Sequence, residues 1–220
     1  MSNASRRKFI LASAAAPFAT ALTARADSGA KPGVFQAAVS GREALRRRSF
    51  PNVALTTHEG KTVRFYDDLL KDKLVVLNLM YADCDGICPV ITQHLVEAQK
   101  ILNDRGHRVG RDLFFYSITV KPEKDTPQAL RDYAEMHHVG PGWTFLTGKP
   151  ADIELLRQKL GYVDPDPKID KDKSQHSGII RYGNEARSLW GACQGNAKPE
   201  WIAEEISFVI RRQEASPKVP

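Results

Sequence analysis

Apolar residues in this chain form two patterns, unbroken runs and stripes at helical spacing. Three segments predict strands, namely 74–80, 112–120 and 143–146. The run at 74–80 is continuously apolar, which is typical of a strand that is covered on both faces of a sheet. Four striped segments predict helices with one buried side, namely 89–103, 126–138, 150–160 and 199–212. Strands and helices therefore alternate through the middle of the chain, which is typical of an α/β sandwich.

Shorter strands flank this alternating part. Residues 53–57 and 61–65 predict two strands about a turn, followed by a short helix at 66–70. Residues 178–182 and 186–190 predict a hairpin, because Gly183-Asn184 between them favours a tight turn. The full order predicts an α/β fold with a mixed central sheet flanked by helices. This is the element order of a thioredoxin-like domain.

The first residues have the layout of an export signal. Arg6-Arg7-Lys8 precedes an apolar stretch that ends near Leu22, and Ala24-Arg25-Ala26 offers small residues for cleavage. The paired arginines indicate the twin-arginine route, and about 14 apolar residues are too few for a membrane span, which needs about 20. We therefore expect an exported, periplasmic protein that begins near Asp27, with no membrane span in the mature chain. A retained anchor is the alternative.

Composition supports one domain and few classes of partner. The expected parts are a twin-arginine-type signal peptide at 1–26, a flexible basic linker at 27–48, a domain at 49–214 and a tail at 215–220. The net charge of +6 falls to +2 without residues 1–26, because these contain four basic and no acidic residues. A mature chain so close to neutral gives no reason to expect nucleic acid or a membrane surface as a partner.

Cys84 and Cys88 carry the main chemical signal. They lie where the strand at 74–80 gives way to a helix, and a helix N-terminus favours a thiolate. Two thiols four residues apart can share one side of a turn. The pair indicates either copper, since soft thiolates favour Cu(I), or thiol–disulfide exchange. Two buried apolar side chains, or a structural disulfide, are the plain alternatives.

Six histidines could supply a further copper ligand. His176 stands out because it follows a polar loop and precedes the strand at 178–182, where a side chain can reach other strand-end loops. A lone loop histidine is nevertheless more often a surface residue. The other five are expected at exposed turns, on a polar helix side or at a helix end: His58, His94, His107, His137 and His138. Cys193 is expected to be a buried thiol, with a resolving thiol or an extra ligand as the alternative.

Four motifs occur in order along the domain. They are Cys84-x-x-x-Cys88-Pro89, Pro122-Glu123-x-Asp125-Thr126-Pro127, Trp143-x-x-Leu146-Thr147-Gly148 and His176-Ser177. Together they resemble the SCO/SenC family of periplasmic and mitochondrial copper proteins that serve cytochrome c oxidase assembly. The resemblance covers roughly residues 50–212 and implies a thioredoxin-like fold that binds one copper ion, Cu(I) or Cu(II). It matches Cys84, Cys88 and His176 to the copper ligands of the family.

Three places depart from the pattern of that family. Lys121 stands where the family usually has Asp, and Ser174-Gln175 precedes His176 where Val-Asp is typical. Asp85-Gly86 lies inside the cysteine loop, where we would expect a Pro-containing sequence. A cation at position 121 alters the charge near the metal or a partner.

Two functions compete for the cysteine pair. The resemblance implies a metallochaperone that delivers copper to a cuproprotein acceptor, such as a cytochrome c oxidase subunit, without turning over a substrate. In the alternative, Cys84 and Cys88 are the catalytic redox pair of a thiol–disulfide oxidoreductase that reduces the metal-ligand cysteines of a partner. The spacing of the two cysteines is longer than the two-residue spacing of many such enzymes. A peroxidase is disfavoured by Tyr81, where the peroxidase pattern has threonine.

Overall fold

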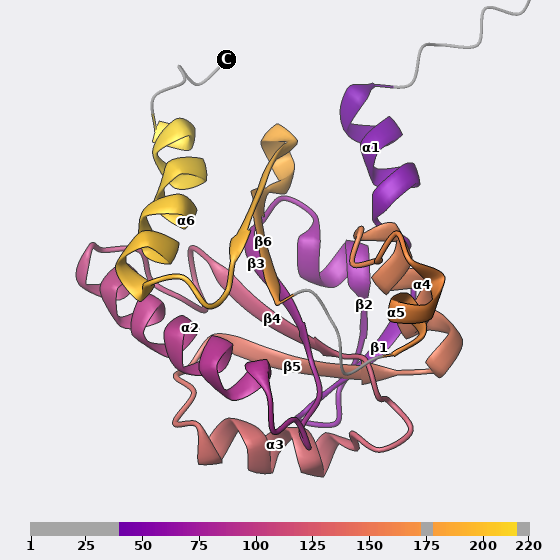
Figure 1. Ribbon diagram of the computed structural model, residues 1–220. Helices are drawn as coiled ribbons and strands as arrows, with labels where there is room; N and C mark the ends of the chain where they lie inside the picture. The colour runs from indigo at the N-terminus through magenta and orange to yellow at the C-terminus, as the bar shows by residue number, and fades with distance from the viewer. Residues whose placement is uncertain (1–39, 173–177, 215–220) are drawn as a thin grey trace, which may run out of the picture. The chain divides into compact units, whose positions relative to one another are not determined.

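The computed structural model describes residues 40–172 and 178–214, shown in Figure 1. The strands are β1 (Ala54–Thr57), β2 (Thr62–Arg64), β3 (Leu74–Met80), β4 (Phe114–Thr119), β5 (Trp143–Gly148), β6 (Ile179–Asn184) and β7 (Leu189–Gln194). The α-helices are α1 (Gly41–Ser49), α2 (Ile87–Asp104), α3 (Pro127–Met136), α4 (Pro150–Lys159), α5 (Pro167–Lys171) and α6 (Pro199–Glu214). A π-helical turn, η1 (Phe65–Leu70), and a 3-10 turn, η3 (Glu185–Arg187), complete the elements.

The seven strands form one mixed sheet in the order β2-β1-β5-β4-β3-β6-β7. Strands β3, β4 and β5 are parallel to one another, whereas β6 pairs antiparallel with β3. Every residue of β3 is buried, as expected for an unbroken apolar run with helices on both faces of the sheet. The predicted α/β fold with a mixed central sheet is confirmed.

Helices cover both faces of this sheet. Helix α2 packs along α6 (Figure 1), and the hydroxyls of Thr92 on α2 and Tyr133 on α3 are hydrogen bonded at 2.9 Å. Helices α1 and α4 lie over the opposite face, where their ends border one cavity above Leu77. Within residues 40–172 and 178–214, no helix is both long enough and apolar enough to cross a membrane.

Helix α1 lies at the end of the segment 27–48 that is expected to be a linker. Ser40 Oγ accepts a hydrogen bond from the Glu43 backbone N–H at 3.2 Å and caps the helix. Arg42 then donates from Nε to Glu185 at 3.0 Å, across the whole domain sequence. A local cap and a distant ion pair therefore hold this helix in place. The signal at 1–26 and the start of the linker lie outside the described residues.

The hairpin also turns later than the sequence predicts. Strand β6 continues through Gly183-Asn184, and the turn is made by η3 with Ser188 in the left-handed region at φ 54°. Gly183 lies inside the strand because the indole of Trp190 covers it, and a Cβ there would come within 2.3 Å of Trp190 Cε3. The glycine therefore serves packing between neighbouring strands rather than a tight turn.

Candidate metal centre

Cys84 and Cys88 meet at the junction of β3 and α2. Cys84 lies in the connecting turn, and Cys88 is the second residue of α2, which begins two residues before the predicted proline. Both thiols are buried, with exposed fractions of 8% and 1%. Their side chains are hydrogen bonded to each other, and no disulfide is present within the described residues. The structure therefore brings the predicted pair together.

The two thiols have different electrostatic environments. Burial opposes ionisation of Cys84, but hydrogen bonds from the Cys88 thiol, the Tyr81 hydroxyl and the backbone N–H groups of Cys88 and Gly86 outweigh it. The pKa of Cys84 is therefore lowered from its ordinary value. Burial, and then the hydrogen bond to Cys84, raise the pKa of Cys88. Cys84 is the sulfur that ionises more readily, and Cys88 is its donor.

Asp125 holds the turn that carries Cys84. Its carboxylate accepts hydrogen bonds from the Ala82 backbone N–H at 3.0 Å and from Thr119 Oγ1. These contacts tie the residues after β3 to the end of β4. Asp125 is 2% exposed, and this burial raises its pKa. The motif that contains Asp125 thus supports the turn of the motif that contains Cys84. The sequence position of Asp125 alone does not reveal this role.

Lys121 lies against the same turn. Its Nζ is 3.4 Å from the centroid of the Tyr81 ring and 3.5 Å from Asp83 Oδ1. Lys124 Nζ lies 3.1 Å from the other oxygen of Asp83. The departure noted at position 121 therefore places a cation over the ring whose hydroxyl donates to Cys84.

His176 lies outside the described residues. The described chain ends at Asp172 and resumes at Gly178, which has φ +61° and packs against the first turns of α2. A Cβ at Gly178 would lie 2.9 Å from Ile87 Cδ1, and Ile87 is the neighbour of Cys88. Strand β6, which follows His176 in sequence, thus begins beside the helical turn that carries a cysteine.

The other candidate ligands have different partners. His58 Nδ1 is bonded to the Phe145 backbone N–H at 3.1 Å, and His94 Nδ1 lies 3.2 Å from the Gly195 carbonyl. His137 packs on the Tyr133 ring, at 4.3 Å between centroids. His138 follows α3 with φ 53°, and the backbone of His107 donates to the carbonyl of Leu102. In the part of the chain that is described, no three His, Cys, Asp or Glu side chains are grouped as a metal site.

Cys193 is a buried thiol, as expected. It lies on β7 opposite Ile180 and is 5% exposed. Burial, and to a lesser extent the charge of Glu205, raise its pKa to about 12. A thiol with so high a pKa is a poor nucleophile near neutral pH, which disfavours a role as a resolving thiol.

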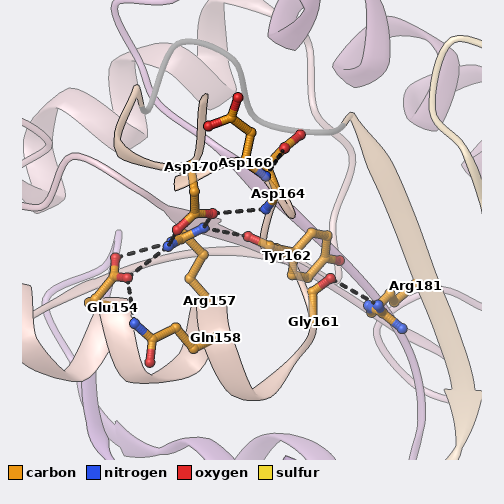
Figure 2. A network of polar contacts seen from close by, with 9 residues as sticks. All are labelled: Glu154, Arg157, Gln158, Gly161, Tyr162, Asp164, Asp166, Asp170 and Arg181. Carbon is orange, nitrogen blue, oxygen red and sulfur yellow. Dashed lines mark hydrogen bonds and ion pairs between the residues drawn. The ribbon is translucent and has the colours of Figure 1, made fainter. Parts of the chain in front are cut away.

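A polar network fixes the chain just before position 173 (Figure 2). Arg157 donates to both carboxylate oxygens of Asp170 at 2.5 and 2.6 Å, and its Nε donates to Glu154 at 3.0 Å. Asp170 belongs to α5, a helical turn inside the region that the sequence predicts to be a polar loop. Asp166 caps this turn and Pro167 is its first residue, a pairing that signals a helix start.

Comparisons with known proteins agree with the fold. The family model described as SCO1/SenC matches residues 45–211. SCO2-like protein RC0895 of Rickettsia conorii is 30% identical over 123 residues, which are 53% of this chain and 57% of that protein. The chain thus matches little more than half the length of this relative.

Two solved structures share the architecture. Copper-bound yeast Sco1 superposes with a TM-score of 0.59 at 19% identity, covering 75% of this chain and 92% of that one. BsSco, a member of the Sco family of cytochrome c oxidase assembly proteins in which a disulfide switch is described, superposes with a TM-score of 0.58 at 22% identity, covering 71% of this chain and 90% of that one. These likenesses confirm the thioredoxin-like fold, and the family model covers most of the chain. The chain belongs to the SCO1/SenC family.

Proposed function

We propose that this chain is a metallochaperone that binds one copper ion through Cys84, Cys88 and His176. The observation that carries the proposal is the meeting of two buried thiols at the β3–α2 junction, beside the start of β6. Thiolate and imidazole ligands suit copper, and Cu(I) tolerates a small number of ligands. Yeast Sco1, a family relative, has been crystallised with copper bound.

The acceptor that we propose is a periplasmic cuproprotein, such as the copper-containing subunit of a respiratory cytochrome c oxidase. BsSco is described as a member of a family of cytochrome c oxidase assembly proteins, which supports this choice. A site of three protein ligands leaves room for a ligand of the acceptor to bind the copper ion before the ligands of this chain dissociate from it. Export by the twin-arginine route, with residues 1–26 as the signal, is part of the same proposal.

Copper titration of the reduced protein tests the proposed site. The parent should bind one equivalent of Cu(I) in competition with a chelator. Cys84→Ser and Cys88→Ser should each abolish this complex, and His176→Ala should weaken it at least about tenfold, or about 1.4 kcal/mol. Cys193→Ser and His94→Ala are matched controls that should bind as the parent does. Unchanged binding by either Cys84→Ser or Cys88→Ser would contradict the proposal.

A second candidate function is thiol–disulfide exchange, favoured by the hydrogen bond that already joins the two thiols. The thiolate of Cys84 would attack a disulfide of the partner, and Cys88 would resolve the mixed disulfide. Two electrons and two protons would pass to the partner, leaving a Cys84–Cys88 disulfide.

Trapping with Cys88→Ser separates the two functions. Under thiol exchange, this variant should accumulate a mixed disulfide with the partner, and His176→Ala should react at the parental rate. A chaperone that only transfers copper should accumulate no such species, and its transfer should depend on His176.

A further inference from the structure

A second concave site lies on the face of the sheet that α1 and α4 cover. It is a cavity of about 430 Å³ whose floor includes Leu77, Arg181 and Trp190. Its walls are the C-terminal ends of α1 and α4. Ligand pockets commonly have volumes of about 300–1,000 Å³, so this one can take a small molecule. None of its lining residues belongs to the β3–α2 junction.

All the charged residues that line this cavity are positive. It is lined by Arg48 of α1, Lys159 at the end of α4 and Arg181 of β6, and by no Asp or Glu. Neighbouring Arg47 is neutralised by Glu43 at 2.7 Å, whereas no described carboxylate lies within ion-pairing distance of Arg48 or Lys159. Three cations converging on one cavity favour an anionic ligand.

Two N–H donors of the lining residues have no acceptor. Arg181 Nε and Trp190 Nε1 are buried, and neither has a hydrogen-bond partner among the described residues. Among the described residues, the guanidinium of Arg181 donates a 3.3 Å bond to the Gly161 carbonyl, as Figure 2 shows, and lies over the Tyr162 ring. Buried donors are rarely left unpaired in proteins, so an acceptor brought by a ligand would complete both.

Apart from Ser49, Gly161 and Ser188, the rest of the lining is apolar and partly aromatic. The Phe50 and Trp190 rings lie 4.6 Å apart between centroids, at an angle of 37°. Leu45, Leu77 and Leu160 add aliphatic surface. A bare oxyanion would leave this surface exposed to water, whereas a ligand with an apolar body would cover it.

We propose that this cavity binds a small organic anion that has one carboxylate or sulfonate head group and an aromatic or alkyl body. The head group lies among Arg48, Lys159 and Arg181 and accepts from the two unpaired donors. The body packs on Phe50 and Trp190. Because the ligand touches α1, α4 and the sheet together, it also holds α1 against the domain.

Titration of the full chain with naphthalene sulfonate, followed by NMR, tests this site. The indole N–H resonance of Trp190, assigned from Trp190→Phe, should move to saturation and identify the contact. Inorganic phosphate, which lacks the apolar body, should bind at least about tenfold more weakly. Arg48→Ala and Arg181→Gln should each weaken naphthalene sulfonate binding about fivefold or more.

Arg47→Ala is the matched control, since Arg47 is adjacent on α1 but is paired with Glu43. It should bind as the parent does. Arg48 is exposed and its removal should not perturb folding, so it decides the outcome if Arg181→Gln fails to fold. An unmoved Trp190 resonance, equal binding of phosphate, or an equal loss in Arg47→Ala would each overturn the proposal.

Discussion

Glu185 is a buried carboxylate that accepts hydrogen bonds from three residues, and Arg42 donates to it through both Nε and Nη2. Its side chain is 3% exposed and accepts from Arg42 Nε at 3.0 Å, the Tyr66 hydroxyl at 2.7 Å and the Asp72 backbone N–H at 2.9 Å. Burial opposes its charge, but these hydrogen bonds outweigh burial and lower its pKa from the ordinary value. The ionised form of Glu185 therefore stabilises the folded state, and it does so fully above the unfolded pKa near 4.5.

Glu185→Gln should lower the free energy of unfolding by about 1–3 kcal/mol at pH 7, because a neutral amide cannot replace a charged carboxylate that accepts from three residues. In the parent, the stability that ionised Glu185 contributes should begin to fall as the pH drops below about 4.5. It should be lost once the pH has passed through the lowered pKa of the folded state. The difference in free energy of unfolding between the parent and Glu185→Gln should therefore become smaller in acid. Urea unfolding at several pH values measures it, with Glu59→Gln, an exposed pair partner of Lys61, as the control. A difference in unfolding free energy that stays constant with pH would contradict the proposed role of the Glu185 charge.

Residues differ in how far their roles could be predicted. Cys84 and Cys88 could be identified because their chemistry and their spacing are both local properties of the sequence. The roles of Tyr81 and Asp125 could not, since they depend on where a hydroxyl and a carboxylate point after β3 and β4 have paired. Asp125 was part of a recognised motif, but the motif does not say which neighbour it holds.

At the scale of elements, α5 is held in place just before the described chain breaks off at Asp172. Arg157, 7% exposed, holds Asp170 of α5, and the described chain ends two residues later at Asp172. At the other end, Gly178 packs on α2. The described residues on either side of 173–177 are therefore held by Arg157 and by α2.

Arg157→Ala should lower copper affinity about fivefold by releasing the first of these ends, and competition with a chelator measures this. In a His176→Ala background, the same change should have no further effect, because the ligand that it positions is gone. Arg108→Ala, which breaks an exposed pair with Asp112, is the control. Equal losses in both backgrounds would show that Arg157 acts through general stability instead.

The type of an element could be predicted from the sequence where the pattern of residues is local. The boundary of an element could not be predicted where contacts with distant residues set it. The apolar run of β3 fixes a buried strand without reference to any partner. The end of β6 depends instead on Trp190 lying over Gly183, and α1 depends on Glu185, 143 residues away from Arg42. Neither contact has a signature in a short window of sequence.

At the scale of the whole molecule, copper would join parts of the chain that are distant in sequence. Cys84 and Cys88 belong to the β3–α2 junction, and His176 precedes β6. A ligand at 100 times its dissociation constant stabilises the folded state by about 2.7 kcal/mol. For a chain of this size, that should raise the melting temperature by about 5–10 °C.

Calorimetry of the reduced protein with and without Cu(I) measures the change. Cys84→Ser should melt at the same temperature in both conditions, and Cys193→Ser should shift as the parent does. A shift that persists in Cys84→Ser would place the metal elsewhere.

The pairing of Arg42 with Glu185 sets a lower limit on how far the chain can be shortened. A fragment that starts at residue 50, where the sheet region begins, would keep every strand and every cysteine. It would also leave the Glu185 carboxylate buried without its guanidinium. Expression of such a fragment should therefore yield less soluble protein than expression from residue 40, although both contain the same proposed ligands.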